Sequence, residues 1–432
     1  MEKSLLKSVM MDLQKEFIAI DVNERNIVLE DYICYCLVGV RRSGKSYLLY
    51  QKMQELIDHG LDKKRIVYLN FEDERLAEMT YKDFNLIIEC YYELTGLKDK
   101  PILFLDELQQ IDGWERFARR LADQKYSAYI TGSNSKMLSY EMSGKLGGRY
   151  VLKTVFPYSF KEYLKGNNVQ FTQNDFYSTE SRAQLRYLYS DYLTYGAFPE
   201  LLTFKLLGLS EQKRRDYLQN VYTNIYIGDI LVRNNINQGM TIKIILKKMA
   251  ESVMQPISYR KLTNLIKSTG IQIGISTVIN YIDYIKESFL IFSLENYQAK
   301  LIDKVSEPKY YFIDTGLLNL FINDYHTKDL ENIIAIELVR RYGFENVYYY
   351  KKNVEVDFLI PSESLAIQVS FSVLNNEETY KREMRSLVKL ANYYEHLKCI
   401  IITDDEEKVV EESGVEITVM PAIKFLLGLD EL

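Results

Sequence analysis

Eight residues near the start of this 432-residue chain combine glycine, lysine and serine at a spacing that suits phosphate binding. They run Gly39-Val40-Arg41-Arg42-Ser43-Gly44-Lys45-Ser46, and Tyr47 follows them directly. The preceding apolar residues, Tyr32 to Val38, predict a buried strand, and residues 47–57 predict a helix. In a strand–loop–helix unit, the backbone N–H groups of the loop and of the helix N-terminus converge on one point. We therefore expect the loop and Tyr47 to bind the phosphates of a nucleotide.

Two side chains of the loop have separate expected roles. Lys45 is expected to reach the β- and γ-phosphate oxygens, while the Ser46 hydroxyl takes one coordination position on Mg²⁺. Gly39 and Gly44 permit a close approach of the backbone that a Cβ would block. The alternative interpretation is a simple glycine turn capped by a lysine.

A second signal follows in the acids Asp106 and Glu107, which end the apolar run Pro101 to Leu105. A continuous apolar run of this length is typical of a strand buried on both faces of a parallel sheet. Carboxylates at the end of such a strand emerge at the ligand crevice. There Asp106 is expected to hold the metal, and Glu107 to polarise the attacking water of a hydrolysis reaction.

Two further predicted strands end in polar residues. Residues 126–131 lead to Ser133 and Asn134, and we expect Asn134, ahead of Ser133, to hydrogen-bond the γ-phosphate or the water. The alternative for Asn134 is an ordinary Asx turn. Residues 66–71 lead to Glu72 and Asp73, which would add negative charge near the metal.

Together these motifs carry a family resemblance: residues 39–46, Asn70 to Asp73, Leu105 to Glu107 and Thr131 to Ser133 occur in one chain. The chain resembles the prokaryotic AAA-type ATPases that carry an uncharacterised C-terminal region. The resemblance implies ATP and Mg²⁺ as ligands, and ATP hydrolysis as the activity.

The same resemblance implies an arginine that contacts the γ-phosphate from its own or a neighbouring subunit. Arg149 matches that position best, and its alternative is a turn arginine. Arg119 and Arg120 are weaker candidates because residues 114–122 read as an amphipathic helix, whose polar face is charged in any case. A neighbouring-subunit arginine would require a homo-oligomer.

Composition narrows the remaining function classes. The formal charge is −6, so nucleic-acid binding would need a local basic face. No apolar run approaches the roughly 18 residues of a spanning helix, and the first residues lack an apolar signal core. The four cysteines and three histidines show no metal-ligand spacing. We expect a cytoplasmic protein with no membrane partner.

The middle of the chain predicts mainly helices. We assign residues 1–155 to the ATPase core, 156–235 to a helical lid or linker, and 236–300 to a module that resembles a winged helix, with Ser276 as the N-cap of its second helix. That helix begins with small and apolar residues, and its basic face is modest. Packing against a protein is therefore favoured over DNA reading, with DNA kept open as a partner.

Residues 301–432 predict a helix, three strands, a helix and a strand, an order that resembles the PD-(D/E)XK nuclease core. Glu337 and Asp357 match two acids of that core, whereas Gln368-Val369-Ser370 replaces its acid-x-Lys sequence. Gln368 is a poorer Mg²⁺ ligand, and Ser370 supplies no ammonium. We interpret this module as a catalytically silent fold. The alternative is that a lysine from another position, such as Lys351, Lys352 or Lys381, supplies the missing ammonium.

The sequence thus predicts an α/β fold: a P-loop parallel sheet with helices on both faces, a helical and winged-helix-like region, and a small nuclease-like α/β domain. The expected function is an ATP-hydrolysing switch whose C-terminal modules bind a macromolecular partner. The alternative is an ATP-gated, metal-dependent nuclease acting on DNA or RNA.

Overall fold

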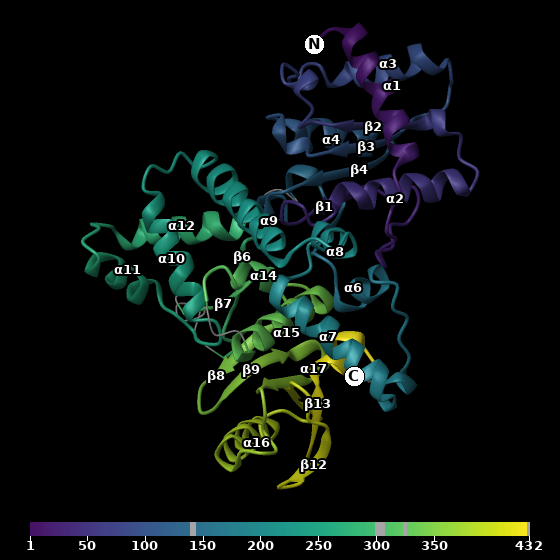
Figure 1. Cartoon of the computed structure of the whole chain (residues 1–432). Helices are drawn as coiled ribbons and strands as arrows, with labels where there is room; N and C mark the ends of the chain where they lie inside the picture. The colour runs from purple at the N-terminus through teal and green to yellow at the C-terminus, as the bar shows by residue number, and fades with distance from the viewer. Residues whose placement is uncertain (139–143, 299–306, 323–325, 430–432) are drawn as a thin grey trace. The chain divides into compact units, whose positions relative to one another are not determined.

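The computed structural model describes residues 1–138, 144–298, 307–322 and 326–429. They belong to two compact units, residues 1–156 and 157–432, each with its own sheet (Figure 1). The boundary falls directly after Phe156, before the Pro-Tyr-Ser sequence that leads into the first helix of the second unit.

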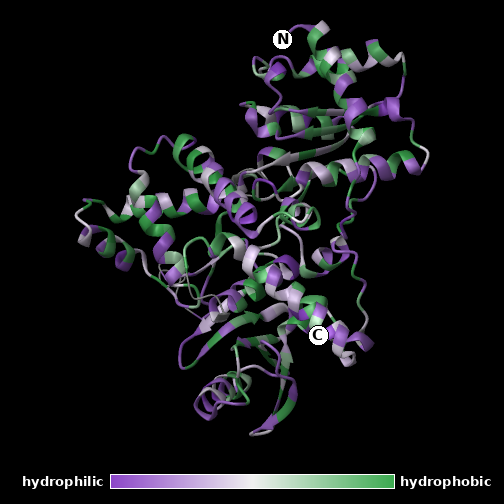
Figure 2. Ribbon diagram, viewed as in Figure 1, coloured by the Kyte–Doolittle hydropathy of each residue, from purple (hydrophilic) through white to green (hydrophobic). Residues whose placement is uncertain are grey.

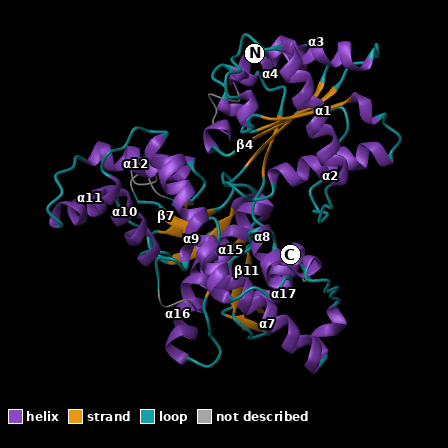
Figure 3. Ribbon diagram, turned by 45° about the horizontal axis from the view of Figure 1, so that its top comes forward, coloured by secondary structure: helices purple, strands orange, loops and turns teal. Residues whose placement is uncertain are grey.

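A five-stranded parallel sheet forms the centre of the first unit, in the order β2-β3-β4-β1-β5. Its strands are β1 (Tyr35–Val38), β2 (Ile66–Asn70), β3 (Ile102–Asp106), β4 (Ser127–Gly132) and β5 (Val151–Thr154). Every residue of β1 and β3 is buried, as the apolar runs predicted. These central strands lie between layers of helices (Figure 3).

The helices of the first unit cover both faces of this sheet. They are α1 (Lys3–Ala19), α2 (Lys45–Asp58), α3 (Phe84–Thr95) and α4 (Trp114–Asp123). The connection through α2 runs across the sheet in one direction, and those through α3 and α4 run in the other. Since such crossovers are right-handed, α2 covers one face while α3 and α4 cover the opposite face. The predicted α/β fold with helices on both faces is confirmed.

The second unit begins with four α-helices and a π-helical segment. These are α6 (Phe160–Gly166), α7 (Thr179–Tyr195), α8 (Pro199–Leu206), α9 (Glu211–Asn224) and η6 (Ile225–Val232). Short 3-10 turns occur in both units, at η1 (Lys63–Arg65), η2 (Glu74–Leu76), η3 (Leu108–Gln110), η4 (Ser135–Leu138), η5 (Gln173–Tyr177) and η7 (Pro361–Glu363).

Three helices and a two-stranded antiparallel ribbon follow. They are α10 (Gly239–Glu251), α11 (Tyr259–Ser268), α12 (Ile275–Glu287), β6 (Ile291–Leu294) and β7 (Lys309–Phe312). Ser258 caps α11 through its side chain. The prediction that Ser276 caps α12 is wrong: Gly274 is the N-cap, and the helix begins one residue before the serine.

A six-stranded mixed sheet ends the chain, in the order β12-β13-β11-β10-β9-β8. Its strands are β8 (Tyr348–Lys351), β9 (Glu355–Ile360), β10 (Leu365–Val369), β11 (Lys398–Thr403), β12 (Lys408–Glu412) and β13 (Val415–Pro421). The helices of this region are α14 (Thr315–Leu318), α15 (His326–Tyr342), α16 (Glu377–Ala391) and α17 (Ala422–Leu427). Its core joins the apolar faces of α16 and the central strands, and α16 is hydrophilic on its other side (Figure 2). The last two strands and α17 extend the order that the sequence predicted.

Candidate functional site

The phosphate loop lies between the end of β1 and the start of α2. A Cβ on Gly39 would come within 2.1 Å of the carbonyl oxygen of Val155, so only glycine fits where the loop passes β5. Gly44 has a φ of 94° and directly precedes the first helical residue, Lys45. Glycine adopts that left-handed conformation without the cost that a side chain would add. The two glycines therefore shape the turn that directs loop N–H groups toward the helix N-terminus.

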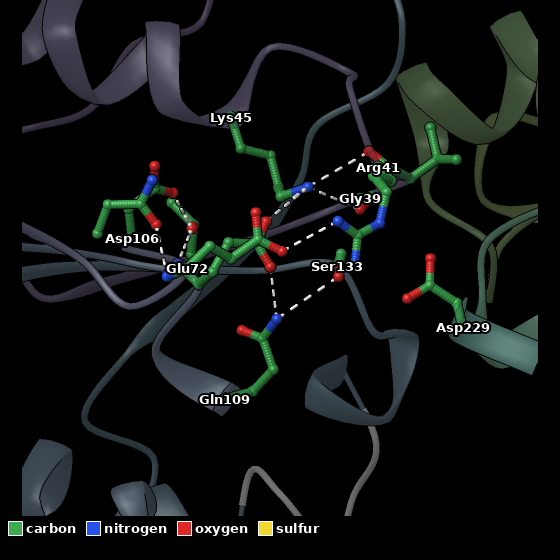
Figure 4. Close-up of polar contacts among 12 residues, drawn as sticks. Gly39, Arg41, Lys45, Glu72, Asp106, Gln109, Ser133 and Asp229 are labelled. Atoms are coloured by element: carbon green, nitrogen blue, oxygen red, sulfur yellow. Dashed lines mark hydrogen bonds and ion pairs between the residues drawn. The ribbon is translucent and has the colours of Figure 1, made fainter. Parts of the chain in front are cut away.

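Lys45 is buried, and its ammonium lies over the loop itself (Figure 4). Its Nζ donates hydrogen bonds to the carbonyl oxygens of Gly39 at 3.1 Å and Val40 at 3.3 Å, and it lies 3.4 Å from Oε1 of Glu107. The loop lysine and the second acid of Asp106-Glu107 thus come together, although 62 residues separate them in sequence. This contact joins the two motifs in one site.

Asp106 ends β3 and is almost fully buried. It accepts hydrogen bonds from the Tyr68 hydroxyl, at 3.1 Å, and from the Thr131 hydroxyl. Burial and the charge of Glu107 raise its pKa, while hydrogen bonds from Ser46 and Thr131 act in the opposite direction. Ser46 and Asp106 are therefore neighbours, and together they offer the hydroxyl and carboxylate oxygens that Mg²⁺ prefers.

Glu107 has a left-handed backbone, with φ of 52°, and its N–H donates to Oγ1 of Thr131 at 2.9 Å. Burial alone would raise its pKa, but the nearby Lys45 charge and a hydrogen bond from Gln109 lower it below the usual value. The side-chain amide of Gln109 donates to Glu107 and, at 3.5 Å, to Oγ of Ser133. Glu107 is consequently an ionised carboxylate held in one orientation, as a proton acceptor requires.

The structure also reveals partners of the two acids to which the sequence interpretation gave no role: Tyr68, Gln109 and Thr131, the last quoted above only as part of a motif. Thr131 lies beside β3 because β3 and β4 are adjacent parallel strands, so a comparison of neighbouring strand ends could have found it. Ser133 is buried beside Gln109, and Asn134 follows it, half-buried.

The loop also contains two adjacent arginines, Arg41 and Arg42. Arg41 forms an ion pair of 2.9 Å with Glu72, so this acid contacts the phosphate loop. Arg42 has a left-handed backbone, with φ of 66°.

Arg149 lies at the other end of the sheet from its own phosphate loop. It donates to the Asp123 carboxylate at the C-terminus of α4 and to the carbonyl oxygen of Gly147. It precedes Val151, which pairs with the first residue of β1, whereas the loop follows the last residue of β1. A contact from Arg149 to the loop of its own subunit is therefore excluded in this arrangement. Of the two weaker candidates, Arg119 lies 3.9 Å from Asp123, and Arg120 donates to Asn85.

Comparisons with known proteins agree with this geometry. Residues 32–164 match the profile of an AAA domain, and residues 186–327 match a domain of unknown function. The uncharacterized protein MJ1544 of Methanocaldococcus jannaschii is 33% identical over 406 residues, covering 90% of this chain and 87% of the relative. An uncharacterized protein of Haemophilus influenzae is 30% identical over 387 residues, covering 88% and 91%.

The chain belongs to this family of AAA-type P-loop proteins. Among solved structures, the Walker-type ATPase PABY2304 of Pyrococcus abyssi is similar at 14% identity and a TM-score of 0.40, with 71% of this chain and 99% of that chain covered. Among the helices that the structure describes, none is long and apolar enough to cross a membrane.

Beyond its AAA domain, this family member holds a second cluster of acids around a lysine, in the C-terminal part. Lys309, the first residue of β7, is fully buried, and its Nζ lies 3.0 Å from Asp357, 3.5 Å from Glu331 and 3.8 Å from Glu355. Burial would lower the pKa of Lys309, but these three carboxylates together raise it above its usual value. Lys309 is therefore a charged ammonium inside the protein.

The predicted nuclease residues are only partly brought together. Asp357 and Gln368 are neighbours: the Asp357 N–H donates to Oε1 of Gln368 at 2.8 Å. Glu337 instead forms ion pairs of 3.0 and 2.8 Å with Arg340 and Arg341. The acid of α15 beside Lys309 is Glu331, six residues earlier.

The sequence left open that a lysine from another position, such as Lys351 or Lys381, replaces the missing one. Lys351 contacts Glu355 and Lys381 contacts Glu377, both at exposed positions. Lys309, which the sequence interpretation did not consider, is the lysine that reaches Asp357.

A pocket of about 550 Å³ opens beside this cluster. Its lining includes Asp357, Gln368, Glu383, Arg382 and Lys351. Glu383 accepts hydrogen bonds from Gln368 and Arg382, and Asp357 lies beside Lys309 as described above. The carboxylates of Glu383 and Asp357 therefore already have donors within the protein. Within the described residues, no group of three or more acidic, histidine or cysteine side chains is arranged to hold a metal ion.

Proposed function

We propose that the first unit binds ATP with Mg²⁺ and hydrolyses the β–γ phosphoanhydride bond. The observation that carries this proposal is the meeting of Lys45, Asp106 and Glu107 at the mouth of a glycine-shaped loop on a helix N-terminus. In this proposal residues 39–47 bind the nucleotide phosphates. Ser46 and Asp106 would hold Mg²⁺, whose charge neutralises phosphate oxygens when it is bound.

Different residues of the site have different roles in the proposed reaction. Glu107 takes a proton from water while the water oxygen bonds to the γ-phosphorus and the bridging oxygen leaves with ADP. Gln109 keeps the Glu107 carboxylate in place through the hydrogen bond described above, and Ser133 or Asn134 positions the γ-phosphate or the water. Lys45 leaves the carbonyl oxygens of its own loop for the phosphates, since a phosphate is the stronger acceptor for an ammonium.

The test is ATP turnover and nucleotide binding by the wild type and Lys45→Ala, with Lys64→Ala as a matched control on the exposed turn η1. We expect Lys45→Ala to lose both binding and turnover, Lys64→Ala to keep both, and chelation of Mg²⁺ to stop turnover. Full turnover by Lys45→Ala would refute the proposed site.

For Arg149, the proposed role is to contact the γ-phosphate bound by a neighbouring subunit, because its own loop lies at the other end of the sheet. This role requires a homo-oligomer. We expect Arg149→Ala to reduce turnover by about a hundredfold, the usual loss of one charge-stabilising donor.

A mixing experiment tests the direction of this contact. Lys45→Ala keeps the arginine, and Arg149→Ala keeps the loop. Mixing the two inactive variants should restore part of the turnover if the arginine acts on the neighbouring site. No recovery in a mixture shown to form hybrid oligomers would contradict that role.

For the second unit, we propose binding of a macromolecular partner, with nucleotide state setting its affinity. Two features support this proposal. Helices α10, α11 and α12 followed by the ribbon β6–β7 are in the order of a winged helix, and α15 with strands β8 to β11 and α16 is in the order of a nuclease-like core. We accordingly propose residues 236–300 and 301–432 as two modules after a helical linker at 156–235.

One observation favours a nuclease as a second candidate function: Lys309 places an ammonium 3.0 Å from Asp357, where the sequence lacks the lysine of the acid-x-Lys pattern. Two observations favour a silent fold. Lys309 is wholly enclosed, and the neutral Gln368 stands where an acid would hold a metal. A cleavage assay with Mg²⁺ or Mn²⁺ decides: cutting that is lost in both Asp357→Ala and Lys309→Met would establish the nuclease.

A further inference from the structure

A groove of about 330 Å³ lies between α12 and the segment that leads into α10. Its lining contains no charged side chain. It consists of amides, hydroxyl groups and one isoleucine, and we call it the amide groove: Asn234, Asn235, Ile236, Asn237, Gln238, Thr277, Asn280, Tyr281 and Tyr284. Five of its nine residues are asparagine or glutamine, and four of these five come from one short segment.

The position of α12 makes this groove accessible to a large partner. Val278, Ile282 and Ile285 are buried and fix the helix to the module. Asn280 is exposed on another side of the same helix. Because α12 is the helix after the turn that follows α11, its exposed side is the one that a helix-turn-helix arrangement presents to a groove of duplex DNA.

The charge of this module differs from that of the chain. Residues 236–300 contain eight lysine and arginine residues against four acids, a formal charge of +4, whereas the whole chain carries −6. The module is thus basic in an otherwise acidic protein, a charge that favours nucleic-acid binding. Asp283, an acid of α12, does not line the groove; it lies near Tyr259 of α11, where its charge helps to raise the pKa of that tyrosine.

We propose that the amide groove reads base edges of duplex DNA, with Lys243 of α10 binding a phosphate. This inference rests on the proposed partner-binding role of the second unit and names the partner. An amide side chain offers one donor and one acceptor side by side, which match the N6 and N7 atoms of adenine in the major groove. Asn280 on α12 and Asn237 at the facing edge supply such amides from both sides.

Phosphate binding falls to residues outside the groove. Lys243 is exposed and lies one turn into α10, shortly after the groove residue Gln238. Its ammonium lies 5.3 Å from the ring of Tyr226, which limits its orientation without neutralising its charge. Base contacts and phosphate contacts therefore come from different residues, and two kinds of variant can separate them.

The experiment uses the full chain. Duplexes that it retains from a random-sequence library are sequenced, and the affinity of wild type for the selected duplex and for a scrambled one is measured by fluorescence anisotropy over a range of salt concentrations. We expect a preference for sites containing adenine. Asn280→Ala should weaken binding to the selected duplex by roughly 5- to 150-fold, and to the scrambled one far less.

Lys243→Ala should weaken both duplexes alike and reduce the salt slope by about one. Gln219→Ala, an exposed amide on α9 outside the groove, is the matched control and should change neither affinity. Because Lys243 and Asn280 are both exposed, neither substitution removes a core side chain.

Several outcomes would overturn the proposal. These are the absence of sequence preference, equal losses for Asn280→Ala and Gln219→Ala, or selective binding of RNA or of a protein that Asn280→Ala leaves intact. ATP turnover is measured on the same samples. If the wild type hydrolyses ATP but does not bind DNA, the groove proposal alone is refuted. If the wild type does not hydrolyse ATP, the proposed ATPase activity is refuted.

Discussion

Both units of this protein place a buried lysine against carboxylates, yet the two lysines have different partners and we expect different roles for them. In the first unit, Lys45 contacts two backbone carbonyl groups of its own loop and one carboxylate, Glu107. In the second unit, Lys309 contacts three carboxylates and is completely enclosed. The first ammonium has one carboxylate and two neutral carbonyl oxygens beside it, whereas the second has three carboxyl groups.

The difference shows that the backbone, more than the residue types, decides what such a cluster does. Lys45 is the first residue of a 14-residue helix, preceded by a glycine loop whose N–H groups face an incoming anion. Lys309 lies in a four-residue strand whose backbone groups are paired with β6. A phosphate can therefore compete for Lys45, while Lys309 already has its counter-charges and stabilises the packing of β7 against β9 and α15.

Neutralising one acid in each cluster tests most directly whether the two clusters have separate roles. Glu107→Gln should reduce ATP turnover by about 10²- to 10⁴-fold and leave nucleotide binding intact, because only the proton acceptor is lost. Asp357→Asn should leave turnover unchanged within about twofold, since Asp357 belongs to the other unit's cluster. Steady-state turnover with saturating ATP measures both, and equal losses in the two variants would show that the clusters act together.

A smaller effect is expected on stability when the lysine of the second cluster is replaced. Lys309→Met keeps the volume but leaves the fully buried Glu331 and the half-buried Asp357 without their ammonium partner, and we expect a loss of about 3–5 kcal/mol. Lys351→Met is the control: Lys351 pairs with the same Glu355 at an exposed position, so its loss should cost about 1 kcal/mol or less.

Hydrogen exchange of the β9 and β10 amides in increasing urea measures these losses separately from the first unit. Equal losses for Lys309→Met and Lys351→Met would mean that the enclosed pair does not stabilise the sheet.

The nucleotide cluster was predictable because its parts follow local rules. Each of these residues ends or directly follows a strand, or lies at the start of a helix: Asp106 and Glu107 at β3, Lys45 and Ser46 at α2. The ends of parallel strands meet at one edge of a sheet. Sequence could not place Arg149 in the same way. Its position depends on β5 joining the sheet beside β1, which puts Arg149, two residues before β5, at the far end.

The second cluster was harder to predict because it joins segments that are 22 to 48 residues apart in the sequence. Lys309 begins an apolar strand, a place where a lysine usually marks the solvent boundary, and only tertiary packing encloses it. Glu331 and Glu337 both lie on α15, but six residues turn an α-helix by about 240°. Only one of them can face β9, and the pattern of the helix did not show which.

The smallest expected effect is a difference in pH dependence between the two clusters. Burial, together with the charge of Asp357, raises the pKa of Glu331 to about 7, although Lys309 acts in the opposite direction. Folded Glu331 thus keeps its proton while the unfolded chain loses it above about pH 4.5. The resulting stabilisation is complete below that pH and is lost as the pH rises through 7. Glu107, whose pKa is lowered, has its corresponding transition at more acidic pH.

We therefore expect the second unit to be less stable at pH 8 than at pH 5, with a smaller difference in Glu331→Gln, which cannot ionise. The amide oxygen still accepts the hydrogen bond of Tyr311 that Glu331 accepts at 2.7 Å, so the substitution removes the titration and keeps this contact. Urea midpoints from β9 amide exchange at the two pH values provide the measurement. Asp329, whose pKa is raised to about 8, also makes the second unit less stable as the pH rises, and it is present in both wild type and Glu331→Gln. Only the difference between wild type and Glu331→Gln reports on Glu331, and identical pH dependence of the two would show that Glu331 is ionised in the folded protein throughout this range.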